Sequence, residues 1–498
     1  MLLDLPNEIL VLVLSPLGFR DLVVCKSVCR TLNAVICDVL FLQYKLVLAS
    51  YGLCDNEFSV TAVKQRLQYA HLFNCALRDI RWIPHFTFTF EGQRLDHPSS
   101  FAIFRDLKNP GTLSLIYSGS SLRGAPQRHW VIKAPPASVY TYTFNPAEDL
   151  VILQTMDVPK SRHHLLTMSS GAQHPAASHP YLESETIGLD TTTFGPYLFV
   201  PGTRDFHTLW NWKTGEMVTN IRCHYYAVAF IDQDHLAIAA MTQGVGLALL
   251  IYRLPLIIYN EVTNVMQPAH YAFGLPTLHS QDRIREPRCC SLRRNASYPP
   301  MSTILDAGDF YSDPDDVLLS VESAHPTDQG QYEFFMPLRA LQALMTPENR
   351  GRFTPWANWG PQHVHATPLL RYPPIVGWRA HCIFGMRRIG MYPTQREDGV
   401  LVAKIYDYHP RRVALARKEP SFDGRHWRVV DGENVSDDWL HSDMLETHLP
   451  FIEIEVPLPE EIQHHRGSMV TLGINDDSIV VCTDFIATRP NRVHIYTF

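Results

Sequence analysis

The sequence predicts an α+β protein with a small all-α N-terminal region, a helical linker and a large all-β domain, most simply a β-propeller of about seven blades. Apolar residues recur at helical spacing as far as residue 81. From residue 82 the chain changes to short β-rich runs separated by Pro, Gly, Asn and Asp, and two short patterns recur along them. The 36 prolines among 498 residues disfavour long helices in this second part.

A short amphipathic helix is predicted to start near Pro6. Proline is favoured in a first helical turn, where its missing N–H is not needed, and Glu8 follows where the helix dipole stabilises an anion. Ser15-Pro16 and Gly18 then end the run. Its apolar residues are Ile9, Leu10, Val13, Leu14 and Leu17.

A second helical stretch is predicted over residues 21–38, and Asp21 opens it. Its apolar residues are Leu22, Val23, Val28, Leu32, Val35 and Ile36. Three short helices are too small to bury a good core, because chains below roughly 40 to 60 residues rarely do so without metals, disulfides or partners. Periodicity alone is therefore compatible with a helical cap that belongs to the larger domain.

The order of residues in this region closely resembles an F-box, over residues 1–45. The shared elements are Leu5-Pro6-x-Glu8-Ile9-Leu10, Leu14-Ser15-x-Leu17, Asp21-Leu22 and Val28-Cys29-Arg30. One position departs from the family pattern. Leu32 stands where family members usually carry an aromatic residue, and this replacement stays apolar.

The resemblance implies docking onto the Skp-type adaptor of a cullin–RING ubiquitin ligase through a helix-in-groove interface. In the family, the adaptor is met by the Leu-Pro turn, the first helix and the Val-Cys-Arg region. The corresponding positions in this chain are Leu5, Pro6, Ile9, Leu10, Leu14, Leu17, Leu22, Val28 and Cys29.

Composition narrows the classes of function. The 43 basic and 50 acidic residues give a formal net charge of −7, which provides no pull toward nucleic acid or a membrane surface. No apolar run approaches the roughly 18 to 20 residues of a membrane span, and the N-terminus lacks a secretory pattern. Ten cysteines at irregular spacing, without a C-x-x-C pair, fit reduced thiols. We therefore expect a cytoplasmic or nuclear protein whose partners are proteins.

A helical linker is predicted over residues 46–81. Leu46 and Val47 precede Tyr51-Gly52, which is a stop signal, and helical spacing resumes after Ser59. The apolar residues of the resumed run are Val63, Leu67, Ala70 and Phe73. We expect these helices to join the N-terminal region stiffly to the domain that follows.

The predicted β domain covers residues 82–498 and contains a repeated pattern of an apolar anchor, a polar turn and a strand. The pattern occurs at residues 144–153 and 230–239, an offset of about two repeats of the WD-type length of roughly 40 to 45 residues. Residues 474–482 have the same form, and residues 310–319 are a looser copy.

A second pattern, His207-Thr-Leu-Trp210-Asn-Trp212-Lys-Thr-Gly215-Glu216, is typical of a strand that runs into a turn in which Gly215 has positive φ. It resembles the outer strand of a WD-repeat blade. Regular spacing of such strands favours a β-propeller over a pair of β-sandwiches or another all-β fold. We interpret residues 283–300 and 411–447 as insertions. The whole layout resembles F-box proteins with degenerate WD-like repeats, as in expanded fungal families.

The sequence contains no recognisable catalytic, nucleotide or metal motif. G-x-x-x-x-G-K-[ST], strand-led G-x-G-x-x-G, G-x-S-x-G and H-E-x-x-H are all missing. The pair His363-x-His365 lacks Cys, Asp or Glu at ligand spacing. We therefore expect no cofactor, no metal and no catalytic residue.

One aromatic stretch is the candidate substrate-binding surface, because Trp and Tyr are favoured anchors of interfaces. It comprises Trp356, Trp359, Tyr372 and Trp378, interleaved with prolines. Packing between blades explains the same residues equally well.

These observations favour a non-enzymatic substrate receptor of an SCF-type ubiquitin ligase (Skp adaptor, cullin, F-box), in which the propeller binds a protein substrate. Two other hypotheses stay open. The first is an interaction scaffold that binds the adaptor without ubiquitylation, and the second is a propeller hydrolase with a helical cap. The sequence does not identify the substrate.

Overall fold

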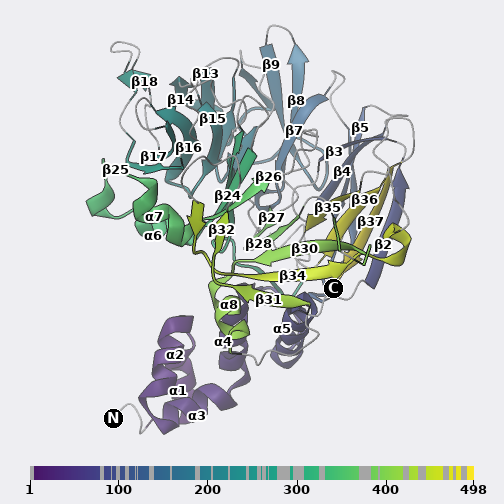
Figure 1. Ribbon diagram of the computed structural model, residues 1–498. Helices are drawn as coiled ribbons and strands as arrows, with labels where there is room; N and C mark the ends of the chain where they lie inside the picture. The colour runs from purple at the N-terminus through teal and green to yellow at the C-terminus, as the bar shows by residue number, and fades with distance from the viewer. Residues whose placement is uncertain are drawn as a thin grey trace.

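The computed structural model describes the chain in segments. These are residues 5–78, 83–90, 92–96, 101–106, 111–117, 119–120, 122–133, 139–157, 160–184, 191–202, 206–222, 225–242, 246–254, 259–260, 265–266, 269–276, 292–294, 308–324, 331–369, 383–390, 393–396, 398–418, 426–435, 445–463, 470–474, 478–483 and 491–497. A group of N-terminal helices lies at one end of a large β domain (Figure 1).

The N-terminal helices follow the sequence prediction of three short helices before the linker. They are α1 (Asn7–Leu14), α2 (Phe19–Val28), α3 (Arg30–Asp38) and α4 (Leu40–Tyr51). Pro6 directly precedes α1. Cys29 is extended, with φ −157° and ψ 163°, so the predicted stretch 21–38 forms two helices. Gly52 ends α4 in the left-handed conformation, with φ +71°, where the sequence predicts a stop.

The predicted linker contains a strand as well as helices. The short strand β1 (Leu53–Asp55) follows α4 and leads to α5 (Val63–Arg78), which packs against α4. The predicted boundary between residues 45 and 46 falls inside α4. Helix α4 therefore runs without a break across the predicted boundary between the first domain and the linker.

Seven antiparallel sheets, each built mainly from consecutive strands, make up the β domain in the described residues. The first three sheets are β3 (Gly92–Asp96), β4 (Phe101–Asp106), β5 (Thr112–Tyr117) and β6 (Arg128–Lys133); β7 (Val139–Asn145), β8 (Leu150–Asp157), β9 (Lys160–Thr167) and β10 (Tyr181–Ser184); β11 (Thr192–Phe194), β12 (Tyr197–Val200), β13 (Phe206–Asn211) and β14 (Glu216–Arg222).

The fourth and fifth sheets are linked by an exchanged strand. The fourth contains β15 (Tyr225–Phe230), β16 (His235–Thr242), β17 (Gly246–Arg253) and β20 (Tyr271–Gly274), and the fifth contains β21 (Leu292–Arg294), β23 (Leu318–Ala324), β24 (Gln331–Pro337) and β26 (His365–Leu369). Strand β25 (Phe353–Thr354) lies between β24 and β26 of the fifth sheet in the chain, but it pairs in parallel with β20 of the fourth sheet.

The sixth sheet is the widest. In spatial order it contains β27 (Ile383–Phe384), β28 (Arg387–Ile389), β30 (Leu401–Asp407), β34 (Phe451–Pro457) and β31 (Trp427–Val430), with β29 (Thr394–Gln395) also paired to β30. Two small hairpins lie outside the seven sheets: β18 (Tyr259–Asn260) with β19 (Val265–Met266), and β32 (Glu433–Val435) with β33 (Leu445–Thr447).

The seventh sheet joins the two ends of the β domain. It contains β35 (Thr471–Ile474), β36 (Ser478–Thr483) and β37 (Asn491–Thr497), and its outer strand is β2 (Ile83–Phe90). Strands β2 and β37 pair antiparallel, with Ile83 opposite Thr497. First strands of successive sheets contact one another, as β7 contacts β11 and β15 contacts β21. This topology is a β-propeller with seven blades, as the sequence predicts.

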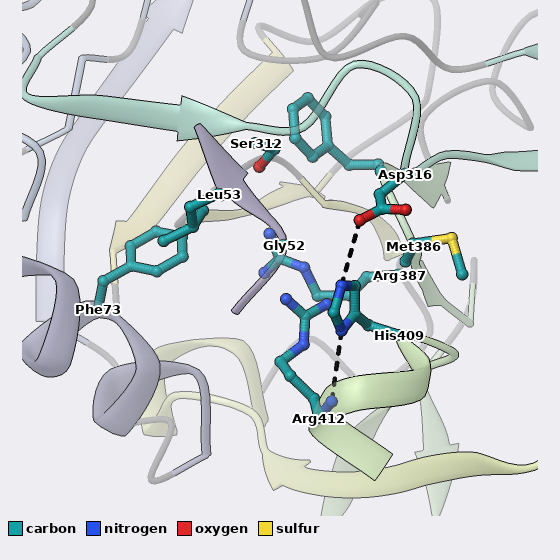
Figure 2. A pocket seen from close by; sticks show the side chains of 11 residues that line it. Gly52, Leu53, Phe73, Ser312, Asp316, Met386, Arg387, His409 and Arg412 are labelled. Atoms are coloured by element: carbon teal, nitrogen blue, oxygen red, sulfur yellow. Dashed lines mark hydrogen bonds and ion pairs between the residues drawn. The ribbon is translucent and has the colours of Figure 1, made fainter. Parts of the chain in front are cut away.

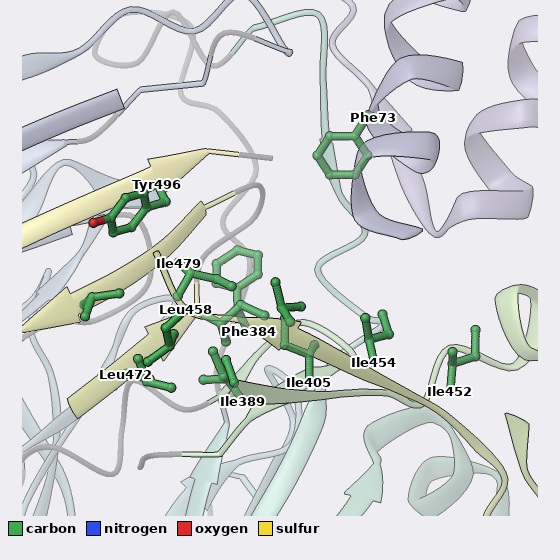
Figure 3. Close-up of a cluster of buried hydrophobic side chains, with 14 of the residues drawn as sticks. Phe73, Phe384, Ile389, Ile405, Ile452, Ile454, Leu458, Leu472, Ile479 and Tyr496 are labelled. Carbon is green, nitrogen blue, oxygen red and sulfur yellow. The ribbon is translucent and has the colours of Figure 1, made fainter. Parts of the chain in front are cut away.

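The core of the propeller is a set of apolar layers between adjacent blades. Blades three and four share one buried cluster around Phe199, Phe230 and Tyr252. Blades four and five share another around Phe273 and Phe334. Blades six and seven share a further cluster, in which Ile405, Ile454, Leu472 and Ile479 pack with Phe73 of α5 (Figure 3).

Both sequence patterns fall at turns within blades. Residues 144–153 and 230–239 each end the first strand of a blade, turn and start the second, and residue 149 is a left-handed Asp with φ +52°. Gly215 has φ +77° in the turn between β13 and β14, as predicted. The looser copy at residues 310–319 differs, because Phe310 lies in β22 (Phe310–Ser312), which pairs with β1 of the linker.

Short helices inside the propeller were not expected from the sequence. They are α6 (Leu338–Leu344), α7 (Trp356–His363), α8 (Pro410–Ala416) and α9 (Glu460–Gln463), with 3₁₀ turns at Pro146–Glu148 and Pro347–Asn349. Of these, α8 lies at the start of the predicted insertion 411–447 and contacts α4.

His163 of β9 provides a pH-dependent element between blades. Its side chain is fully buried, its Nε2 lies 3.3 Å from Ser161 Oγ, and its Nδ1 has no hydrogen-bond partner in the described chain. Burial, together with the nearby charge of His164, lowers the pKa of His163 from 6.5 to about 4. The ring is therefore neutral in the folded protein at neutral pH.

We predict that His163 makes the protein less stable on acidification. Because the pKa of His163 is depressed in the folded protein, the unfolded chain takes up a proton on this ring at a higher pH than the folded protein does. The free energy of unfolding is therefore highest above pH 6.5 and decreases as the pH falls toward 4, by about 3 kcal/mol in total. His163→Gln should flatten the dependence of the unfolding midpoint on pH in this window. His129→Gln, at an exposed position of β6, should leave the slope unchanged, and equal slopes for all three proteins would contradict the assignment.

Candidate functional site

The first three helices and the start of α4 enclose a small apolar core. Its buried members are Leu10, Leu14, Leu22, Leu32, Val35, Ile36 and Leu42. Leu32, the departure from the family pattern, belongs to this core. The apolar residues that recur at helical spacing are therefore mainly buried in this core and not on its surface.

The predicted adaptor-contact residues divide into three groups. Leu5 is 38% exposed, Ile9 41% and Val28 65%, and Pro6 is also exposed. Leu17 and Cys29 are half-buried at the edge of the core. Leu10, Leu14 and Leu22 are at most 3% exposed, so their assignment as contact residues is corrected: they support the surface from inside.

Several apolar side chains outside the predicted set are exposed on the same helices. They are Leu12 and Val13 of α1, Val23 and Val24 of α2, and Leu40 and Phe41 at the start of α4. Single exposed apolar residues are ordinary, but clusters of them on short helices mark interaction sites. Periodicity missed these residues because it predicts that apolar positions are buried.

Helix α4 has two opposite apolar faces, and each belongs to a different core. Leu42 and Leu46 pack with the first three helices. Tyr44 and Leu48 are buried in the cluster shared with blades six and seven. Positions two residues apart on a helix point in nearly opposite directions, at about 100° per residue. One helix therefore fastens the N-terminal region and the propeller to each other.

The linker also pairs with strand β22, which lies between β21 and β23 in the chain, and polar contacts within the linker and α4 hold β1. Strand β1 pairs antiparallel with β22, and Phe73 packs edge-on against Phe310 with ring centroids 5.6 Å apart. Tyr44 Oη donates to Asp55 Oδ1 at 2.8 Å, and Arg66 donates to the same oxygen at 2.6 Å.

Asp309 holds the loop that follows β1. Its Oδ1 accepts a hydrogen bond from Ser59 Oγ at 2.6 Å, and its carbonyl accepts one from the backbone N–H of Asn56 at 3.1 Å. Asn56 Nδ2 donates to the carbonyl of Gly308 at 2.7 Å. The loop after β1 is thus tied to Gly308 and Asp309.

A buried histidine closes the junction where α4 meets the propeller. His409 Nε2 lies 3.3 Å from Asp316 Oδ2, and its Nδ1 accepts the backbone N–H of Arg412 (Figure 2). Burial and the neighbouring Arg412 charge lower the pKa of His409. The ring is therefore neutral, with its proton on Nε2, where it is donated to Asp316. Residues of this junction, including Gly52 and Phe73, line a small cavity.

The candidate substrate-binding aromatics lie in different environments. Trp359 of α7 is 2% exposed, packs against Phe273 and donates its Nε1–H to the carbonyl of Gly274 at 2.9 Å. It joins blades four and five, which corrects its assignment to an exposed surface. Trp356 is half-buried against Trp359. Tyr372 and Trp378 lie outside the described residues.

No group of three or more His, Cys, Asp or Glu side chains in the described part of the chain is arranged to hold a metal ion. His365 is buried among Tyr408 and Phe451, with its Nδ1 2.5 Å from Tyr408 Oη. No single described helix has the length and apolar composition of a membrane span. The pair α3 and α4 meets these criteria only when taken together, with a bend of 85°.

Residues 2–48 match the model of the F-box-like family. The N-terminal segment is an F-box-like domain. The match includes α1, α2, α3 and most of α4, so this domain shares α4 with the linker. The comparison with curated proteins found no match to the chain.

Among solved structures, the chain is similar at low identity to two WD40 domains and to a third protein. The WD40 domain of Toxoplasma gondii coronin is 10% identical over 79% of this chain and 93% of that one, with a TM-score of 0.32. The WD40 β-propeller domain of Doa1 is 8% identical over 84% and 97%, with a TM-score of 0.31. Kluyveromyces lactis Hsv2 is 9% identical over 80% and 90%, with a TM-score of 0.38. At these scores, the assignment of a propeller depends on the sheet topology alone.

We predict that Gly52→Ala destabilises the junction by about 1 to 3 kcal/mol. A Cβ at this left-handed position would lie 2.5 Å from His409 Nε2, in addition to the backbone strain. Gly351→Ala is the matched control, because Gly351 has φ +70° but no atom within 4 Å of its Cβ position. Denaturant unfolding should show a larger loss for Gly52→Ala, and equal losses would exclude a contribution from the His409 contact.

Proposed function

We propose that the protein is the substrate-recognition subunit of an SCF-type E3 ubiquitin ligase. Its F-box-like domain would bind a Skp-type adaptor, and its propeller would bind a protein substrate. The main support is that the family match at residues 2–48 coincides with helices whose apolar side chains are exposed. Through the adaptor, the chain would join a cullin–RING ligase.

The exposed faces of α1 and α2 are the proposed adaptor surface. Ile9, Leu12 and Val13 lie on α1, and Val23 and Val28 lie on α2. Burying one such side chain fully is worth roughly 1.5 to 3 kcal/mol, so a few of them suffice for a specific complex. The buried residues Leu10, Leu14 and Leu22 act indirectly by fixing the positions of the helices.

The propeller is proposed to hold the substrate, and the chain itself is proposed to be non-catalytic. Ubiquitin transfer would be performed by the partner subunits. We place the protein in the cytoplasm, the nucleus or both, where such ligases meet their substrates. Proteasome-dependent loss of a captured partner would separate this role from that of a scaffold, which would leave the partner's abundance unchanged.

We predict that Ile9→Asp combined with Val28→Asp weakens the binding of a purified Skp-type adaptor to the full chain. A charge that must be desolvated in an apolar interface should weaken binding at least about tenfold, equivalent to about 1.4 kcal/mol. The unfolding midpoint should change little, because both side chains are exposed. Leu10→Ala is unsuitable for this test, since that residue is in the core.

The matched control is Leu72→Asp, which places the same charge on an exposed apolar position of α5 in the linker. It should capture the adaptor as well as the unchanged protein does. Undiminished capture by the Ile9→Asp, Val28→Asp protein would overturn the proposed adaptor surface. Failure of the unchanged protein to capture any Skp-type adaptor would overturn the proposed function.

A further inference from the structure

Helix α8 belongs to blade six, yet it contacts α4 of the helical region, which is far from it in sequence. The helix starts the segment that the sequence analysis treats as an insertion. It lies next to α4 at the base of the propeller (Figure 1). Its two arginines, Arg411 and Arg412, are adjacent in sequence and both reach toward the N-terminal helices.

Both arginines bind the carboxyl end of α4. Arg411 donates to the carbonyl of Ala49, and Arg412 donates to the carbonyl of Tyr51 at 2.6 Å. The last carbonyls of a helix have no partner within the helix, and the helix dipole makes this end negative. Two guanidinium groups therefore satisfy the end of α4 both by hydrogen bonding and by charge.

Arg412 is held in place by the propeller. Its guanidinium makes a two-point contact with Asp407, the last residue of β30, with distances of 2.6 and 2.8 Å. Both side chains are nearly buried, and Asp407 Oδ1 also accepts the backbone N–H of His409. The position of α8, and of the arginine beside it, is thus set by blade six.

Arg411 extends the attachment to a second helix of the F-box-like domain. Its guanidinium carbon lies 4.3 Å from the ring centroid of Phe19, the first residue of α2. This contact joins the propeller to α2 without passing through α4. A second attachment point matters because α3 and α4 meet at an angle of 85°, where a change in bend would swing α1 to α3.

We propose that α8 is a brace, in which Arg411 is the positioning residue that fixes the orientation of the F-box-like domain relative to the propeller. On its own, helix α4 fixes the F-box-like domain only with respect to the axis of α4. The Arg411 contact with Phe19 fixes rotation about the bend between α3 and α4. One consequence rests on the proposed function: the brace would keep the bound adaptor and the bound substrate at a constant separation.

The test measures the distance distribution between genetically encoded fluorescent labels at Ala34 of α3 and Gln233 of blade four, both exposed, in the full chain without adaptor. The unchanged protein should give one narrow distribution. Arg411→Ala should give a broader or shifted one, because the ring contact and the cap of Ala49 are lost. Arg417→Ala, which removes only an exposed ion pair with Asp431 at the end of α8, should match the unchanged protein.

A folded Arg411→Ala protein with an unchanged distribution would overturn the brace. If this variant does not fold, Phe19→Leu decides, since it removes the ring and leaves the helix cap: a broader distribution supports the brace and an unchanged one overturns it. Adaptor capture is measured on the same proteins. If the unchanged protein does not capture the adaptor, the proposed function is refuted, but the distance result still decides on the brace.

Discussion

The burial of both faces of α4 is the constraint on which the rest of the structure depends. Leu42 and Leu46 cannot leave the core of the F-box-like domain without rotating Tyr44 and Leu48 out of the core beneath blades six and seven. Such a rotation would expose apolar surface on both sides at once. The helix therefore couples the stability of a small domain, which has little core of its own, to that of a large one.

Blade five shows how the propeller accommodates this coupling. In blades two and four, the apolar anchor of the repeated pattern ends the first strand and starts a tight turn. In blade five the equivalent anchor, Phe310, instead lies in a strand that pairs with the linker and packs against Phe73.

Much of the architecture could be predicted from local chemistry. Gly52 and Gly215 could be identified because Gly52 follows a run at helical spacing that must stop and Gly215 follows a strand that must turn. Both have positive φ. The strand repeats indicated a propeller of about seven blades, once two segments were interpreted as insertions. Exposure within the N-terminal helices could not be predicted, because Ile9 and Leu10 are equally apolar neighbours and only tertiary packing makes one of them exposed and the other buried. The brace was also hidden, since contacts such as Arg411 with Phe19 join positions far apart in sequence.

Pairing of β2 with β37 has a consequence for the synthesis of the protein. The F-box-like helices leave the ribosome before the β domain, and the strand that completes the seventh blade follows the other described strands. Contacts between such distant segments form late in folding. A prematurely terminated chain would thus display the apolar faces of α1 and α2 while β2 had no neighbour. Under the proposed function such a fragment would occupy adaptor without a finished propeller, so translation errors near β37 would be inhibitory rather than silent.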